Sequence, residues 1–333
     1  MNLLCKYRIF IAGVALTVPL LSAYADDDDK KPIIMNIDTG KPCPEVPRSN
    51  PDPLGEGATL MQPDLHFEPV TAKEEPMGAP FIDDDIDLSH ASISFSRVSM
   101  PASFRGTRPN QLYGGECLTP FFMKLASGKS VKVLQIGDSH VRGNYFPLAI
   151  REMLYDTFNK EKKTVTFDYI GINGAQASKF AGADMLRTIA SKKADLIIIS
   201  FGTNEAHGNF VASSHTRILQ SLTDGIRRSQ PDVQILLTTP PGSHIARGGS
   251  GKVPNRVNGN VADNIIAFGR NQNIAVWDLY HIAGGNDNAC TNWTRARLMQ
   301  ADKVHYTATG YKLMGRLLTE ALLKAYVRSV RLD

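Results

Sequence analysis

The chain has 333 residues, a formal net charge of +4 at pH 7 and four cysteines. No two cysteines have C-x-x-C spacing and no His/Cys cluster occurs, so the sequence gives no support for a structural zinc site. Basic and aromatic residues are not interleaved, which argues against a nucleic-acid-binding protein.

The first 25 residues are predicted to be a secretory signal. Lys6 and Arg8 precede an apolar stretch, Ile9 to Leu21, and Ala23-Tyr24-Ala25 forms a small-x-small cleavage site. The apolar stretch is short for a membrane span and contains Pro19. We therefore expect an exported bacterial protein, periplasmic or extracellular, without a membrane span once the signal is removed.

Three cysteines remain after that removal, namely Cys43, Cys117 and Cys290. In an oxidising compartment they allow one disulfide and leave one odd thiol. Their spacing does not say whether any two of them are paired.

Residues 26–110 are predicted to form a Pro-rich acidic arm that is extended or partly disordered. The arm contains 12 of the 19 prolines and little periodic apolar pattern. Residues 26–90 carry a net charge of −11 and residues 91–333 a net charge of +13. This asymmetry indicates attraction of the basic body to an anionic surface or polymer, or binding of the arm to the body. Separate solvation of both parts explains it equally well.

The end of the arm, residues 91–100, alternates apolar and polar side chains with one slip. We expect it to add an edge strand or to lie across the globular body.

Residues 111–333 alternate strands and helices and are predicted to form one domain. Asp195 to Phe201 contains the run Leu-Ile-Ile-Ile, which is typical of a central strand buried on both faces. The alternation predicts an α/β fold, a three-layer α/β/α sandwich with a central parallel sheet. Strands are expected at 131–136, 165–170, 195–201, 233–238 and 274–277, and helices at 118–126, 145–158, 179–191, 213–229, 257–270 and 307–330.

A serine, a histidine and an aspartate stand where loops of such a sheet form a ligand crevice. Ser139 follows the first strand and begins a helix, whose N-terminus stabilises negative charge. A serine hydroxyl needs a neutral imidazole to accept its proton, and the imidazolium then needs an anion. His305 and Asp302 offer that pair. Taken singly, Ser139 is better interpreted as a helix cap, and Asp302 is equally well interpreted as one.

Gly174 and Asn204 are candidates for an oxyanion hole. A glycine lets its backbone N–H approach a tetrahedral intermediate, and an asparagine amide gives a second uncharged donor beside the N–H of Ser139. The alternatives are an ordinary turn for Gly174 and a loop hydrogen bond for Asn204.

These motifs resemble those of the SGNH hydrolase family, also called GDSL-like esterases and lipases. The blocks are Val133 to His140, with His140 in place of leucine; a reduced block at Gly171 to Gly174; Ser200 to Glu205, with Glu205 where aspartate is common; and Asp302 to His305. The resemblance implies a flavodoxin-like SGNH fold, a Ser139, Asp302 and His305 triad, an oxyanion hole of Ser139, Gly174 and Asn204, and no metal or organic cofactor. Gly171 is the alternative to Gly174.

The G-D-S-H variant, the signal and the Trp293…Asp302…His305 ending resemble exported bacterial peptidoglycan O-acetylesterases. The resemblance implies an exported serine esterase that removes O-acetyl or other short acyl groups from a polysaccharide, with the O-acylated glycan as its partner. A polysaccharide O-acetyltransferase using the same site is one alternative. An inactive envelope- or glycan-binding protein is another.

Other residues near the crevice have two interpretations each. Asp138 is expected to brace the nucleophile turn, and His140 to form a hydrogen bond behind the site. His207 lines the substrate entrance or a solvated loop, and Trp293 stacks on a sugar or belongs to the core. The Gly-rich residues 242–259, with Arg247, Lys252 and Arg256, are predicted to form a long flexible loop, either a basic lid or a surface insertion.

Overall fold

The computed structural model describes residues 34–36, 41–42, 93–247 and 251–331, which belong to one compact unit beginning at Pro32. The predicted signal, most of the predicted arm and Cys43 lie outside the described residues. Within the described part, Cys117 and Cys290 are free thiols, and no helix is long and apolar enough to cross a membrane.

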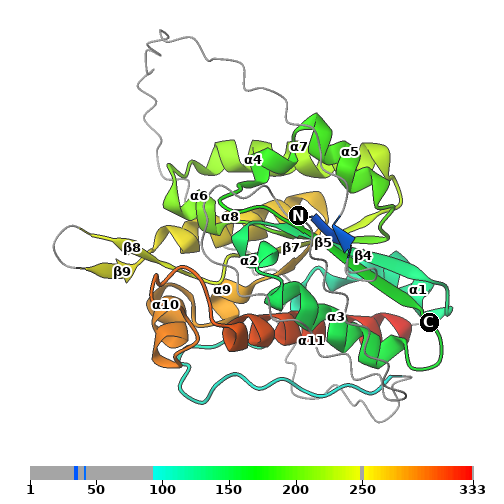
Figure 1. Ribbon diagram of the computed structural model, residues 1–333, viewed down its shortest axis with the longest axis horizontal. Helices are drawn as coiled ribbons and strands as arrows, with labels where there is room; N and C mark the ends of the chain where they lie inside the picture. The colour runs from blue at the N-terminus through cyan, green and yellow to red at the C-terminus, as the bar shows by residue number, and fades with distance from the viewer. Residues whose placement is uncertain (1–33, 37–40, 43–92, 248–250, 332–333) are drawn as a thin grey trace, which may run out of the picture. The chain divides into compact units, whose positions relative to one another are not determined.

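The fold is built on a mostly parallel sheet, as the sequence predicts (Figure 1). Five parallel strands form its centre, in the spatial order β5 (Val165–Gly171), β4 (Val131–Gly137), β6 (Leu196–Ser200), β7 (Gln234–Thr238) and β10 (Ala275–Trp277). Every residue of β6 is buried, which confirms the predicted central strand.

Short antiparallel strands extend the sheet at both edges, and the sequence did not predict them. They are β1 (Ile34–Asn36) with β2 (Lys41–Pro42) beside β5, and β3 (Leu112–Tyr113) beside β10. Two or three residues are too few to show an alternating pattern, so pairing along the edge decides their conformation.

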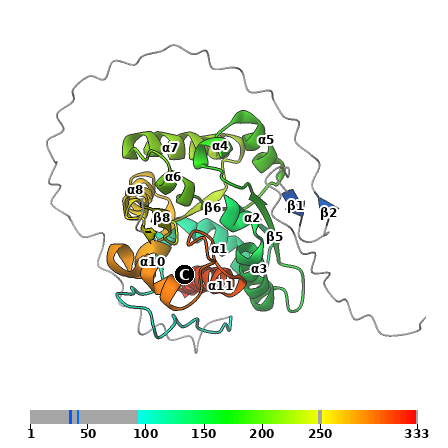
Figure 2. The same cartoon turned by 60° about the vertical axis from the view of Figure 1, so that its left-hand side comes forward.

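Helices cover both faces of the sheet and complete the predicted three layers, which Figure 2 shows from a second side. On one face lie η3 (Gly115–Leu118), α1 (Thr119–Ala126), α3 (Tyr145–Phe158) and α11 (Ala308–Arg331). On the other lie α4 (Ala177–Phe180), α5 (Ala183–Ser191), α7 (Ala212–Ser229) and α8 (Val257–Gln272). The remaining short helices are α2 (Ser139–Arg142), α6 (Thr203–His207), α9 (Leu279–Ile282) and α10 (Gly285–Arg295).

Two predicted elements differ from the structure. The single helix predicted at 179–191 is broken, because Gly182 is extended (φ −69°, ψ 148°) and separates α4 from α5. The loop predicted at 242–259 contains an antiparallel hairpin of β8 (His244–Ala246) and β9 (Lys252–Pro254), after which α8 begins.

The segment before the domain lies across the body and forms no strand between residues 93 and 100. Ile93, Phe95, Val98 and Met100 pack against the core cluster beneath α11. The N–H of Val98 donates to Glu320 Oε1 at 3.2 Å, which attaches this segment to α11. Of the two alternatives from the sequence, the packed segment describes the structure.

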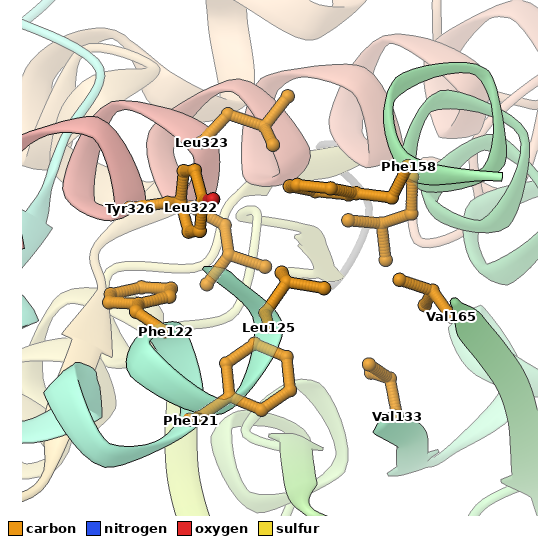
Figure 3. A pocket seen from close by; sticks show the side chains of 10 residues that line it. Phe121, Phe122, Leu125, Val133, Phe158, Val165, Leu322, Leu323 and Tyr326 are labelled. Carbon is orange, nitrogen blue, oxygen red and sulfur yellow. The ribbon is translucent and has the colours of Figure 1, made fainter. Parts of the chain in front are cut away.

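A cavity of about 10 Å³ lies between α1, α3, α11 and strands β4 and β5 (Figure 3). Apolar side chains line it, and the volume reaches only the lower limit for a single water molecule. It is a small packing gap rather than a ligand site. The lining residues are Phe121, Phe122, Leu125, Val133, Leu154, Phe158, Val165, Leu322, Leu323 and Tyr326.

Candidate active site

Three adjacent strands end at the same level of the sheet. Gly137 of β4 stands opposite Gly171 of β5 on one side and Ser200 of β6 on the other. The loops that follow these strands therefore leave the sheet together at the carboxyl ends of the strands. These loops carry the serine, glycine and asparagine candidates.

Glycine at two of these strand ends lets helix α2 lie directly on the sheet. A Cβ at Gly171 would be 2.2 Å from the backbone nitrogen of Arg142, and a Cβ at Gly137 would be 2.3 Å from Val141 Cγ2. Any larger residue would push α2, and Ser139 at its start, away from the sheet. This contact explains Gly171 as a packing residue.

Ser139, His305 and Asp302 form one continuous chain of polar contacts. Ser139 Oγ lies 3.0 Å from His305 Nε2, and His305 Nδ1 lies 2.6 Å from Asp302 Oδ2. The side chains of His305 and Asp302 are 36% and 42% exposed, so a substrate can reach them. The structure thus brings together three side chains that the sequence separates by up to 166 positions.

Asp302 is held as a carboxylate by its own loop. Its Oδ1 accepts hydrogen bonds from the N–H groups of Val304 and His305, both at 2.9 Å. Burial alone would raise the pKa of Asp302, but the hydrogen bonds from the His305 ring and the two N–H groups outweigh it and lower the pKa below its usual value. Asp302 therefore stays charged when the imidazole accepts a proton.

A buried histidine packs behind these three residues, with its ring centroid 5.5 Å from that of His305. His140 Nδ1 lies 2.8 Å from Tyr311 Oη, and its Nε2 lies 3.1 Å from Thr203 Oγ1. Burial, with a further contribution from His305, lowers the pKa of His140 to about 3, so its ring is neutral at physiological pH. His140 thus has the hydrogen-bonding environment that the sequence suggested.

Asp138 and Asn204 connect the nucleophile turn to the neighbouring loops. Asp138 Oδ1 accepts from the N–H of His140 at 2.9 Å and caps α2. Asn204 Nδ2 lies 3.0 Å from the carbonyl of Ala175 and 3.3 Å from Asp138 Oδ2. Burial raises the pKa of Asp138 to about 8. The hydrogen bonds to Ala175 and Asp138 orient the Asn204 amide from two sides.

Gly174 occupies an exposed turn in the left-handed region, with φ +66°. No atom lies within 4 Å of the position that its Cβ would take, so this backbone faces open space. Gly171, the alternative from the sequence, is enclosed by α2. Of the two glycines, only Gly174 has open space at its Cβ position.

Glu205 is a buried carboxylate whose role the sequence did not reveal. Its Oε1 accepts the N–H of Ala177 at 2.7 Å, and its Oε2 accepts the N–H of Gly202 at 2.9 Å. Gln176 Nε2 adds a hydrogen bond to the carbonyl of Asn204 at 3.2 Å. Glu205 thereby ties the loop after Gly174 to the start of α6. A glutamate three positions after Gly202 is typical of a helix N-terminus, so the sequence could have predicted the bond to the Gly202 N–H but not the bond to Ala177.

Residues 136–313, more than half of the chain, match the sequence model of the GDSL-like lipase/acylhydrolase family. The chain belongs to this family. It is accordingly an SGNH-type carboxylic ester hydrolase and an acyl esterase, and the resemblance seen in the sequence motifs is confirmed.

Solved structures share the family fold. A peptidoglycan O-acetylesterase superposes with a TM-score of 0.55 at 20% identity, covering 63% of this chain and 96% of its own. A carbohydrate esterase family 3 protein from Talaromyces cellulolyticus gives 0.45 at 18% identity, covering 59% and 98%. An acetylxylan esterase from Geobacillus stearothermophilus gives 0.44 at 16% identity, covering 59% and 95%. At these sequence identities the similarity shows that this chain shares the fold of those proteins. No curated protein matches the sequence.

Within this family site, His207 and Trp293 have different surroundings. His207 is exposed, its Nε2 lies 2.9 Å from Ser243 Oγ, and its pKa is lowered by burial of part of the ring and by His305. Trp293 is fully buried, donates from Nε1 to the carbonyl of Pro241 at 3.0 Å, and packs edge-on against Tyr306. Stacking of Trp293 on a sugar is therefore wrong, and the core interpretation holds.

Tyr306 extends this buried layer under the histidine. Its hydroxyl donates to the carbonyl of Gly242 at 2.5 Å. Gln300 donates its backbone N–H to the carbonyl of His305 at 2.8 Å and its Nε2 to the carbonyl of Tyr306 at 2.9 Å. The loop that carries His305 is thus anchored from below.

Proposed function

We propose that this protein is an exported serine esterase that removes O-acetyl or other short acyl groups from a cell-wall or other polysaccharide. The observation that carries the proposal is the contact chain from Ser139 through His305 to Asp302. It lies at the open edge of the sheet, beside an oriented asparagine amide.

In the proposed reaction, Ser139 Oγ attacks the ester carbonyl while His305 Nε2 takes its proton. The carboxylate of Asp302 stabilises the resulting imidazolium. The oxyanion accepts hydrogen bonds from the N–H groups of Ser139 and Gly174. Asn204 Nδ2 adds a third when it exchanges its longer bond, to Asp138 Oδ2 at 3.3 Å, for the oxyanion. The leaving sugar oxygen takes the proton from His305.

Water completes the reaction. His305 removes a proton from a water molecule, the hydroxide adds to the acyl group on Ser139, and collapse of the intermediate releases the acid and returns the proton to Ser139 Oγ. No metal or organic cofactor takes part in these steps. Transfer of the acyl group to a sugar hydroxyl would use the same residues, so analysis of the products separates esterase from transferase.

Support for the substrate and the location comes from two sources. The peptidoglycan O-acetylesterase has the same fold. The first 25 residues have the pattern of an export signal. The acidic residues 26–110 are proposed to precede the catalytic domain, residues 111–333, as an arm whose last part, from Ile93 onward, packs on that domain.

Hydrolysis of p-nitrophenyl acetate by wild type and Ser139→Ala tests the chemistry. We expect a fall in kcat of at least about 10³-fold, because no other group replaces the nucleophile. Ser130→Ala is the matched control, since Ser130 is exposed in the loop before β4, at the amino-terminal end of that strand and away from Ser139. Equal rates for wild type and Ser139→Ala would reject the esterase mechanism. Acetate release from O-acetylated peptidoglycan and acetylated xylan then identifies the glycan.

A further inference from the structure

The β8–β9 hairpin is hydrogen-bonded to the loop that carries Asp302 and His305. The backbone N–H of His244 donates to the carbonyl of Lys303 at 2.8 Å, and Lys252 Nζ donates to the carbonyl of Asp302 at 2.6 Å. One bond comes from each strand of the hairpin: β8 contributes a backbone N–H, and β9 contributes the side chain of Lys252.

The base of the hairpin is also fastened to α6, on the asparagine side of the site. Asn255 donates its N–H to the carbonyl of Ser243 and its Nδ2 to the carbonyl of Ala206, both at 2.8 Å. Figure 1 shows the hairpin extending outward from the sheet between α6 and α10. A polymer bound across Ser139 would therefore meet this hairpin as it leaves the site.

This part of the protein is basic and lacks acids of its own. Residues 233–262 contain no Asp or Glu but include Arg247, Lys252 and Arg256. Lys303 faces the hairpin from the triad loop: the pKa of His244 is lowered by burial of its ring and then by the nearby charges of Lys303 and Lys252. The adjacent carboxylate, Asp302, is engaged by His305.

We propose that Lys252 and Lys303 bind an anionic substituent of the glycan, a carboxylate or a phosphate, close to the ester that is cleaved. This inference rests on the proposed esterase function and names its substrate class. An ammonium group has three donors, and Lys252 uses one of them on the Asp302 carbonyl. Two donors on Lys252 and the ammonium of Lys303 remain for an anion at the rim.

The expected contribution is modest because the site is open to water. An exposed ion pair is worth about a 2- to 5-fold change in binding, and added salt weakens it. Wild type should therefore hydrolyse an anionic ester several-fold faster, in kcat/KM, than its neutral counterpart at low salt. The difference should shrink in about 0.5 M NaCl, where the screening length is only a few ångströms.

The substrates for the test are matched. They are an O-acetylated methyl glucuronoside, its neutral carboxyl methyl ester, an O-acetylated glucose phosphate and p-nitrophenyl acetate. Preference for the glucuronoside assigns a carboxylate ligand, and preference for the glucose phosphate assigns a phosphate.

Lys303→Gln and Lys252→Gln should each lower kcat/KM for the anionic substrate about 3- to 5-fold and change the neutral one less. Lys303→Arg should retain the preference. Lys129→Gln, an exposed lysine before β4 at the opposite edge of the sheet, is the control.

Equal kcat/KM for the charged and neutral glucuronosides, together with no preference for the glucose phosphate, would overturn the inference. So would an equal loss on charged and neutral substrates in Lys303→Gln. Absence of hydrolysis of every ester, including p-nitrophenyl acetate, would contradict the esterase function instead. In that case, titration of the Ser139→Ala protein with the acetylated glucuronoside tests the anion site separately. Binding that Lys303→Gln weakens supports it, and no binding overturns it.

Discussion

Replacement of Glu205 by glutamine tests whether the buried clamp positions the oxyanion loops. In the wild type, both carboxylate oxygens accept backbone N–H groups, from Ala177 at 2.7 Å and from Gly202 at 2.9 Å. Glutamine keeps one acceptor but places an NH₂ group against the second N–H. Because the side chain is buried, water cannot satisfy the abandoned donor.

The magnitude follows from the number of bonds lost. One hydrogen bond to a charged group contributes about 1.5–3 kcal/mol, and a buried unpaired donor costs a similar amount. Burial raises the pKa of Glu205, and Asp138 lies near enough to be affected by its charge, so neutralising Glu205 offsets part of the loss. We expect a net destabilisation of about 2 kcal/mol and a Tm lower by roughly 5 °C.

The same substitution should reduce catalysis, because Asn204 and the loop after Gly174 lose their common anchor. Misplacing oxyanion donors lowers kcat more than it raises KM, and we expect kcat to fall about 10-fold. Chemical denaturation and p-nitrophenyl acetate kinetics measure the two effects. Glu161→Gln, an exposed position, is the control. A Glu205→Gln protein within about 0.5 kcal/mol of wild type, with unchanged kcat, would refute the clamp.

Three other substitutions have defined outcomes. Asp302→Asn should lower kcat by about 10²- to 10⁴-fold, because it removes the anion beside the His305 imidazolium, and steady-state kinetics would show this. Asp138 has a raised pKa of about 8, so the folded protein holds a proton that the unfolded chain releases near pH 4. Between pH 5 and 8, the unfolding free energy of the wild type should therefore fall by about 1.4 kcal/mol per pH unit relative to that of Asp138→Asn. Urea denaturation at several pH values measures both, and the same pH dependence in the two proteins would contradict this. Gly171→Ala should displace α2 from the sheet, because its Cβ meets the Arg142 backbone, and lower both Tm and kcat; wild-type values for both would show that the contact relaxes freely.

The central sheet was predictable because its strands are short, mostly apolar segments that alternate with helical patterns. The run in β6 has no polar residue before Ser200, so burial on both faces was its only stable arrangement. The meeting of Ser139, His305 and Asp302 was predictable from motif order, since each motif follows a strand or precedes a helix in a parallel sheet. The direct contact of Ser139 with His305 then follows from the fold.

Features that depend on contacts between distant loops were not predictable. The role of Glu205 requires the loop at Ala177 to return against α6, and no local pattern encodes that approach. The hairpin at β8 and β9 has only three paired residues on each strand, too few for a periodic signal. Trp293 is equally plausible on a surface or in a core, and only packing against Tyr306 decides between them.

Labelling with a serine-directed phosphonate, located by peptide mass spectrometry, tests the proposed nucleophile most directly. Ser139 Oγ lies 3.0 Å from His305 Nε2, so we predict a single adduct on Ser139, its loss in Ser139→Ala and much slower labelling in His305→Ala. An adduct on another residue, or labelling of Ser139 at the same rate without His305, would contradict it.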